Sequence, residues 1–523
     1  MNFNRINLVV LSITLFYNFL YCQLPIKLSH PTQNIIKRLA ILNQVPFEYL
    51  SASPLSTIET INSLKKHDSP LSRIHQRNIT IPKRDTSLIE SSWGWKFNNF
   101  KTQIFKNELN ENKKYFFQIF NDSSTFWLDW NESLIINSNK QKYTTQYLDS
   151  FSFKGIIKNK IFLLSNFSMN RLKTDKDITP QINYNGEWKK YFPEHKTLLW
   201  YKNLTSLYVK NSIFDFEISN FPFSWGWSPQ SSPIIASSAI PFNRFSIYKK
   251  FKKIQFEYFH GSLSSSSIND IHTENIKDAK YIAGHRIQFK LNNKFHTSFS
   301  EIVLYGNRSP EVAYLNPISF FWAQEHNLGD LDNVLMSFDF AWNILPGLAI
   351  YNTFFIDELS WKDIQTNWWG NKYAYQLGLF LAPSKLTLPD LRVEYTYVRP
   401  WTYTHSDFPY THREESLGSP YGPSSAVFHI ESFYYPKPRF TIQTSLDYII
   451  KGDGLGSSVN DNYDLRNKDL DYDTKSFVGN KNIYIVSNII INYQISNYFQ
   501  ISYNIHYNEQ FGNHYATNIN INL

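Results

Sequence analysis

The feature that most constrains this chain is a strict alternation of apolar and polar residues over stretches of about ten residues. One stretch runs from Val334 to Trp342, where apolar side chains alternate with polar ones such as Asp339. Another runs from Phe499 to Tyr507. Similar stretches occur at 373–381, 440–450, 483–493 and 517–523. A period of two predicts β-strands with one apolar and one polar face.

Two architectures contain such strands. In a soluble sandwich or propeller the apolar face covers a core, and strands average about five or six residues. In an outer-membrane barrel the apolar face meets lipid, strands run about ten residues, and aromatic residues border the membrane. The strand length and an aromatic content of 17% favour the barrel. At roughly 24 residues per strand and connection, we expect an all-β fold, a closed antiparallel transmembrane β-barrel of about 18 strands.

Residues 1–22 have the pattern of an export signal. Arg5 precedes an apolar run from Leu8 to Tyr17, which is too short for a spanning helix. After residue 22 no window approaches the roughly 18 to 20 apolar residues that a spanning helix needs. Cleavage after Cys22, the only cysteine, would leave a mature chain without disulfides. The alternative is a lipoprotein acylated on Cys22, and the predicted location is the cell outer membrane.

The segment between the signal and the strands has a different period. Ile35, Leu39 and Leu42 recur at helical spacing, and a second helix is predicted from Ser56 to Lys66. Residues 67–85 are polar and basic and have the pattern of a linker. The predicted division is a signal peptide at 1–22, a periplasmic helical segment and linker at 23–90, and an outer-membrane barrel at 91–523.

Three blocks stand out from the general alternation. They are Trp225-Gly226-Trp227-Ser228-Pro229-Gln230 with 233–242; Ala283-Gly284-His285-Arg286-Ile287-Gln288-Phe289 with 300–306; and Ala313-Tyr314-Leu315-Asn316-Pro317 with 324–335. In this order the blocks resemble the capsule assembly Wzi family of outer-membrane barrels. The resemblance covers about Phe221 to Leu359. Where that family usually has Trp-Gly-Pro-Gly this chain has Trp-Gly-Trp-Ser, a departure that bears on polysaccharide specificity rather than on the fold.

The resemblance implies a partly plugged barrel that helps to attach or assemble capsular or other surface polysaccharide, with no enzymatic activity and no cofactor. The implied partners are that polysaccharide, outer-membrane lipids, lipopolysaccharide and the barrel-insertion machinery, and the expected state is a monomer. Two alternatives keep the fold: a porin-like channel, and a barrel enzyme acting on lipid or lipopolysaccharide. Nucleic acid is not an expected partner despite a net charge of +8, because the chain is exported.

The densest polar cluster in the resembling region consists of Glu325, His326, Asp330, Asp332 and Asn333. These side chains could bind sugar hydroxyls or a plug, because carboxylates and amides accept hydrogen bonds from hydroxyls. The alternative, which we favour, is a satisfied network that fixes a turn between strands. The spacing does not match a calcium-binding loop, so no metal site is predicted.

Aromatic and ionic residues supply further candidates. The tryptophans that could stack on sugar rings, or instead anchor the barrel in the membrane interface, are Trp225, Trp227, Trp322, Trp368 and Trp369. His285 and Arg286 could pair with Glu301 inside the lumen, or form a cross-strand pair that braces the wall.

The chain contains no motif of a known catalytic site. It has no His-Glu-x-x-His, no Gly-x-Ser-x-Gly and no Gly-rich phosphate loop, so no catalytic residue is predicted. The basic run from Lys249 to Lys253 is expected to be solvated loop charge, the alternative being contact with lipopolysaccharide headgroups or an acidic glycan.

Overall fold

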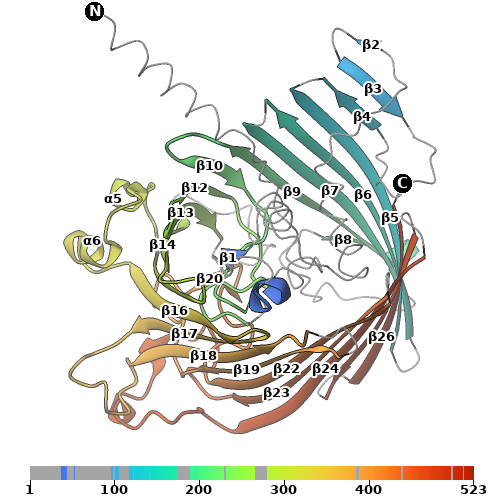
Figure 1. Cartoon of the computed structure of the whole chain (residues 1–523). Coiled ribbons are helices and arrows are strands. Elements are labelled where there is room, and N and C mark those ends of the chain that lie inside the picture. Colours follow the sequence, from blue (N-terminus) through green and yellow to red (C-terminus); the bar gives the residue numbers. More distant parts are fainter. Residues whose placement is uncertain are drawn as a thin grey trace, which may run out of the picture.

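The alternating stretches form one large antiparallel sheet. The computed structural model describes residues 37–43, 52–53, 96–97, 100–104, 117–121, 123–139, 142–158, 160–174, 189–228, 231–264, 279–384, 388–437, 440–495, 499–509 and 512–522. Figure 1 looks along the axis of a ring of strands. The ring is built from eighteen strands: β5 (Ser124–Asn139), β6 (Lys142–Ile157), β7 (Ile161–Thr174), β9 (Thr197–Val209), β10 (Asp215–Ser219), β12 (Arg244–Lys250), β13 (Ile254–Leu263), β14 (Lys280–Lys290), β15 (Phe295–Gly306), β16 (Asn333–Leu345), β17 (Leu348–Glu358), β18 (Lys372–Leu381), β19 (Asp390–Val398), β22 (Ser425–Lys437), β23 (Phe440–Gly452), β24 (Lys481–Gln494), β25 (Phe499–Asn508) and β26 (Gly512–Asn522).

The ring closes where its last strand meets its first. β26 pairs with β5 in an antiparallel register that runs from Asn522 opposite Asn131 to Tyr515 opposite Ser138. Every other neighbouring pair in the ring is also antiparallel, so each of its described strands has a partner on both sides. The predicted all-β antiparallel fold is confirmed, and the strand number agrees with the estimate of about 18.

Shorter strands and helices accompany the eighteen strands of the ring. The additional strands are β1 (Ala52–Ser53), β2 (Lys96–Phe97), β3 (Phe100–Ile104), β4 (Phe117–Phe120), β8 (Lys189–Phe192), β11 (Ser224–Trp225), β20 (Thr411–His412) and β21 (Glu415–Ser416). Besides a helical turn at 37–41, the described helices are α5 (Val312–Leu315), α6 (Phe321–Leu328) and the 3₁₀ turns η1 (Pro193–His195), η4 (Tyr463–Leu465) and η5 (Lys468–Leu470). Among the described residues, no helix has the length and apolar character needed to cross a membrane.

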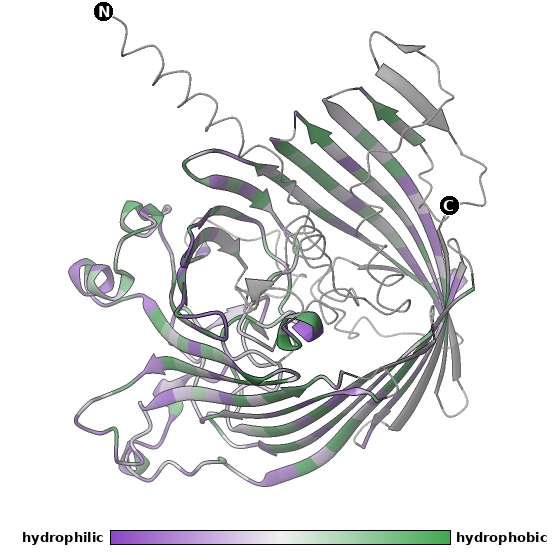
Figure 2. Ribbon diagram, viewed as in Figure 1, coloured by the Kyte–Doolittle hydropathy of each residue, from purple (hydrophilic) through white to green (hydrophobic). Residues whose placement is uncertain are grey.

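Alternation along each strand separates an inner from an outer face. In β16, Ser337, Asp339 and Asn343 are buried on the inner side, whereas Phe338 and Trp342 are exposed on the outer side. Figure 2 shows the same change of hydropathy along the neighbouring strands. The period of two therefore places polar groups inside the ring and large apolar side chains outside it.

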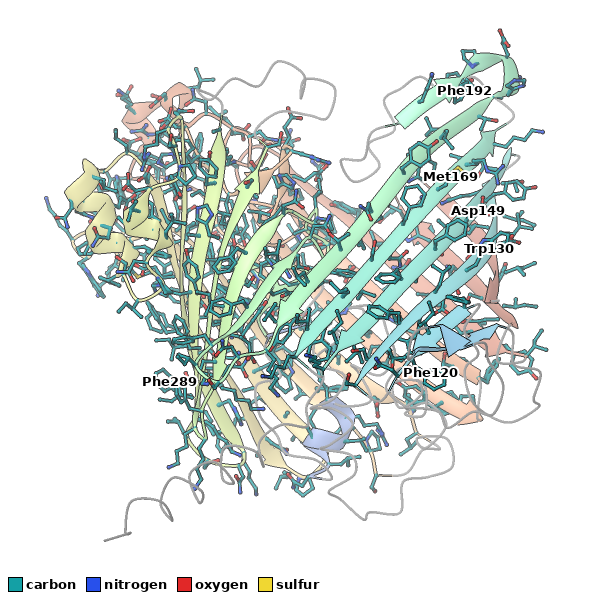
Figure 3. The ribbon with its side chains drawn as sticks, turned by 90° about the horizontal axis from the view of Figure 1, so that it is seen from above. Phe120, Trp130, Asp149, Met169, Phe192 and Phe289 are labelled. Atoms are coloured by element: carbon teal, nitrogen blue, oxygen red, sulfur yellow. The ribbon has the colours of Figure 1, made fainter. Side chains whose placement is uncertain are left out.

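The two ends of the ring differ in the length of their connections. At one end the strands are joined by short turns, such as 158–160, 251–253 and 346–347. At the other end long connections join them, including 220–243, 307–332, 359–371, 399–424 and 453–480. We call these the short-turn end and the long-loop end. Figure 3 shows the strands of the wall lengthwise, with the short-turn end at the bottom.

The lumen is filled from both ends along part of the wall. A helical turn at 37–41, blue in Figure 1, lies inside the ring and buries Leu39 and Ile41 against the inner face of β16, β17, β18 and β22. The connections 220–243 and 399–424 fold inward from the long-loop end and bury Trp225, Ile234 and Tyr403 in a second apolar cluster. The first predicted N-terminal helix is therefore present at 37–41, whereas the second, at 56–66, and the signal segment lie outside the described residues.

The packing of the barrel wall against the segments inside the lumen can be tested at Gly378 in β18. A Cβ added there would lie 2.1 Å from the ring of Tyr351, which is buried between the wall and the helical turn. We expect Gly378→Ala to lower the free energy of unfolding by about 1–3 kcal/mol, because a well-packed interior must shift to accept the extra carbon. The neighbouring change Leu377→Ala, at an exposed outward position, is the control. Chemical denaturation of both variants measures the difference, and equal effects would contradict the packing argument.

Candidate functional site

The centre of the lumen is the place where segments from the two ends of the barrel meet. The Lys37 Nζ of the helical turn donates a hydrogen bond of 2.7 Å to the carbonyl oxygen of Trp227 and lies 5.2 Å from the centre of its ring. Arg38 forms a buried ion pair with Asp390 at the start of β19. Burial, aided by the nearby Arg392, lowers the pKa of Lys37 to about 7. The lumen is thus crossed by packed protein at this level.

A single carboxylate, Glu394, holds the inward-folding connection on the wall. Its side chain, on the inner face of β19, accepts hydrogen bonds of 2.9 Å from the hydroxyls of Ser228 and Ser231 and a third from Tyr351. Gln376 on β18 donates to the Ser231 Oγ at 3.0 Å. We call the inward-folding connection 220–243 the plug. Because the hydrogen-bonding groups come from both the wall and the plug, they fix the plug in one position.

The Trp225-Gly226-Trp227 block forms the interior of this plug. Trp225 donates from its Nε1 to the Glu257 carboxylate of β13 at 3.0 Å, and both tryptophans are almost completely buried. Gly226 has φ of +112°, and a Cβ at this position would lie 2.4 Å from the Ser232 Oγ. Gly226 therefore allows the block to make a tight inward turn that a residue with a side chain would not easily adopt. In this arrangement neither tryptophan presents a free face to a ligand.

The polar cluster predicted at 325–333 is divided between two environments. Asp332 accepts two hydrogen bonds from Arg308, at 2.9 and 2.7 Å, and one from the Tyr314 hydroxyl at 2.7 Å. Asn333 donates to the Phe408 carbonyl at 2.8 Å, toward the lumen. These two residues belong to satisfied networks, which is the alternative favoured from the sequence.

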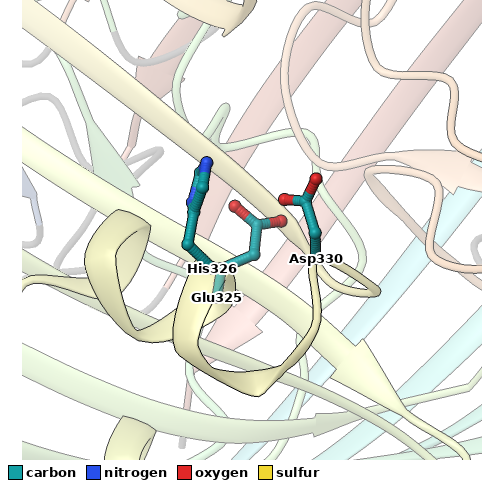
Figure 4. A group of neighbouring side chains, drawn as sticks. All are labelled: Glu325, His326 and Asp330. Carbon is teal, nitrogen blue, oxygen red and sulfur yellow. The ribbon is translucent and has the colours of Figure 1, made fainter.

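Glu325, His326 and Asp330 form a separate group on and just after α6 (Figure 4). Each offers one ligand atom, and these atoms lie within 4.8 Å of one another. Burial, with the nearby carboxylates of Asp330 and Asp332, raises the pKa of Glu325 to about 8. The group has the donor atoms that a divalent cation would accept, but the His326 Nδ1 already lies 2.8 Å from the Trp322 carbonyl oxygen.

The ionic residues predicted to meet in the lumen lie on opposite faces of the wall. Arg286 points inward and pairs with Asp339 at 2.8 Å. His285 and Glu301 point outward, opposite each other on β14 and β15, with a separation of 3.1 Å. The expectation of one inward group is therefore wrong for His285 and Glu301, because consecutive residues of a strand face opposite sides. The pair does bridge adjacent strands, as the alternative proposed.

The basic run at 249–253 lies at the end of β12 and in the turn that follows. This turn belongs to the short-turn end, where the Lys249 Nζ donates to the Ser212 carbonyl oxygen of the adjacent turn. The run is thus at the opposite end of the barrel from the long connections.

The long-loop end carries an aromatic surface that was only partly predicted. We define the rim surface as five of the six aromatic side chains of the connections 359–371 and 453–480: Trp361, Trp368, Trp369, Tyr463 and Tyr472. Trp361 is 88% exposed. The sequence pointed to Trp368 and Trp369 but not to the other three, which lie in connections without periodicity. Turn residues flanking an aromatic between two alternating stretches are the signal that would have found them.

The two connections of the rim surface hold each other. The Trp369 amide donates to the Asp471 carbonyl oxygen at 2.7 Å, and the Thr474 amide donates to that of Asn367 at 3.1 Å. The Arg466 guanidinium lies 3.8 Å from the centre of the Trp369 ring and donates from its Nε to Asp471 at 2.9 Å. A cation stacked on an aromatic ring and tied to a carboxylate makes a pre-formed surface.

Comparison with solved structures supports the class of this fold, a closed β-barrel similar to that of an outer-membrane protein. Wzi of Escherichia coli, described as an outer-membrane protein involved in group 1 capsule assembly and a carbohydrate-binding β-barrel, matches with a TM-score of 0.58 at 12% identity over 94% of this chain and 98% of that one. OprD of Pseudomonas aeruginosa matches with a TM-score of 0.40 at 11% identity, over 80% and 99% of the two chains. OccAB2 of Acinetobacter baumannii matches with a TM-score of 0.45 at 9% identity, over 77% and 98%. No protein-family profile and no curated protein sequence matches the chain.

The role of Glu394 as the anchor of the plug predicts a local effect. We expect Glu394→Leu to loosen the 224–236 segment, because Ser228, Ser231 and Tyr351 lose their common acceptor. Hydrogen exchange of amides in that segment should accelerate at least roughly tenfold, which corresponds to about 1.4 kcal/mol of opening free energy. Glu394→Gln keeps an acceptor oxygen and should show a smaller effect. Unchanged exchange in the Leu variant would show that other contacts hold the plug.

The raised pKa of Glu325 predicts a pH dependence of α6. The folded state binds the Glu325 proton more tightly than the unfolded state does, so this contribution to stability is present below the unfolded-state pKa of about 4.5 and declines as pH rises toward about 8. Glu325→Gln should remove that decline. Hydrogen exchange of α6 amides, corrected for the intrinsic pH effect and measured from pH 5 to 9, tests this. A decline of equal size in the variant would assign the effect to other groups.

Proposed function

We propose that this protein is embedded in the outer membrane and assists the attachment or assembly of capsular or other surface polysaccharide, acting as a non-catalytic monomer. The observation that carries the proposal is the rim surface, an aromatic surface with Trp361 and Tyr472 exposed, on a barrel whose lumen is crossed by packed segments. The likeness of the fold to Wzi, which binds carbohydrate, supports the same direction.

The membrane location is argued from the outer face of the ring. Large apolar side chains are exposed on many strands, among them Tyr147, Phe167, Phe245, Phe338 and Leu377. A water-soluble protein rarely exposes an apolar surface of this extent. A ring in which each strand is paired on both sides satisfies its backbone in lipid. Short turns at one end and long connections at the other are typical of outer-membrane barrels, whose long loops face the outside of the cell.

The polysaccharide contact is argued from the chemistry of the rim surface. Aromatic faces suit the apolar faces of sugar rings, and the Tyr hydroxyls and the Trp indole nitrogens can hydrogen-bond to sugar hydroxyls. Arg466 lies 3.8 Å from the centre of the Trp369 ring and is paired with Asp471, so it holds the ring in place while its own charge is balanced. A platform of this kind on the outer side would hold a polymer without changing it.

The first test is the partition of surface polysaccharide between cells and medium. In a deletion strain we expect polymer to be made but shed, and complementation should restore its attachment. The double variant Trp361→Ala with Trp369→Ala should weaken binding roughly tenfold or more, because aromatic anchors dominate recognition. Trp342→Ala, an outward position on the wall of the barrel, is the matched control.

The outcomes separate the alternatives. If cell-bound polymer is unchanged in the deletion strain, the attachment proposal is wrong. Single-channel conductance of the reconstituted protein then tests a porin-like role, and analysis of lipid products tests an enzymatic one. If the deletion sheds polymer but the double variant does not, the polymer binds elsewhere than on the rim surface.

A further inference from the structure

The connection between β15 and β16 folds over the outside of the barrel. Residues 307–332, which include α5 and α6, lie beside the strands in both views of the molecule (Figures 1 and 3). Tyr314 and Phe321 are completely buried against Tyr258 and Val303 on the outer face of the wall. The Tyr258 hydroxyl donates to the Tyr314 carbonyl oxygen at 2.8 Å. We call residues 307–332 the outer segment.

The outer segment reaches well below the rim. The outward-facing Glu301 carboxylate accepts hydrogen bonds of 2.8 Å from the amides of Phe321 and Trp322, at the start of α6. Glu301 precedes Gly306, the last residue of β15, by five positions, which corresponds to about 17 Å along the strand. The first turn of α6 is therefore held against the side of the wall rather than above it.

Below this point the wall continues as an apolar surface. The next outward pair of β15 and β16 is Phe299 opposite Phe338, whose rings are 5.0 Å apart. Phe338 and, further along, Trp342 are exposed. The outer segment is thus continuous with the surface that we assign to lipid.

The outer segment exposes many large apolar side chains. Seven large apolar side chains of this segment are between 38% and 83% exposed: Val312, Leu315, Ile318, Phe320, Trp322, Leu328 and Leu331. Two of its charged groups are paired with each other, Arg308 with Asp332, and Glu325 is buried, whereas the exposed polar side chains His326, Asn327 and Asp330 gather at the end of α6. A connection that lies only in water would not expose so many apolar side chains within so short a stretch.

We infer that the outer segment is immersed in the outer leaflet of the membrane, at the boundary between acyl chains and headgroups, so that lipid covers its exposed apolar side chains. The apolar side chains enter the acyl region, as in helices that lie in a membrane interface. The segment also covers the ionic pair of His285 and Glu301, which would otherwise face hydrocarbon at high cost. This inference rests on the proposed membrane location.

Site-directed spin labelling of the whole protein in lipid vesicles tests the inference. Cysteine is introduced at Ile318, at Phe338 or at Trp361, in a chain whose only native cysteine, Cys22, is replaced by serine. Collision rates with oxygen, which is enriched in lipid, and with a water-soluble nickel chelate report the environment of each label. We expect the label at 318 to shift toward oxygen access as the label at 338 does, and the label at 361 to favour the chelate.

Each other outcome overturns a defined statement. A label at 318 that favours the chelate, while 338 favours oxygen, refutes the inference and leaves the membrane location standing. A label at 318 shielded from both reagents indicates a second copy or a protein partner on the outer segment, which also refutes it. Chelate access at both 318 and 338 shows that the barrel is not in the bilayer, so that the proposed function fails as well.

Discussion

The whole structure depends on the pairing of β26 with β5. Once this pair closes the ring, each of its described strands has its backbone partners on both sides, and the sheet needs no further element to protect an edge. Closure also gives the period of two its meaning, since every second side chain must then face a confined lumen and every other one the surroundings. The polar interior and the apolar exterior follow from this single constraint.

The polar side chains inside a confined lumen need hydrogen-bond or ion-pair partners, and here the chain itself supplies them. Glu394 receives hydroxyls from a segment that enters at the long-loop end, while Asp390, four residues earlier on the same strand, binds Arg38 of the helical turn from the short-turn end. The two segments meet at Lys37 and Trp227. Buried carboxylates that would be costly when unpaired thus become the anchors of a plug.

The wall could be predicted from the sequence because each strand is specified by the alternation within its own residues. The alternation from Val334 to Trp342 predicts both the strand and which of its side chains face inward or outward. β16 has the strand and the two faces as expected. The same rule, applied to neighbours, would have shown that His285 and Arg286 cannot both face the lumen. The connections could not be predicted in this way, because they have no periodicity. The burial of Trp225 and Trp227 depends on Glu257 and Lys37, which are remote in sequence.

The polar residues of the wall explain where its connections go. On the surface that we propose to meet hydrocarbon, an outward-facing carboxylate such as Glu301 needs hydrogen-bond donors, and the chain supplies them from outside the ring. The amides at the start of α6 are such donors, because the first turn of a helix has N–H groups without partners in the helix. An inward carboxylate such as Glu394 makes the same demand from within. Connections from the long-loop end therefore fold inward to Glu394 and outward to Glu301, and 359–371 and 453–480, which bind each other, remain at the end to form the rim surface.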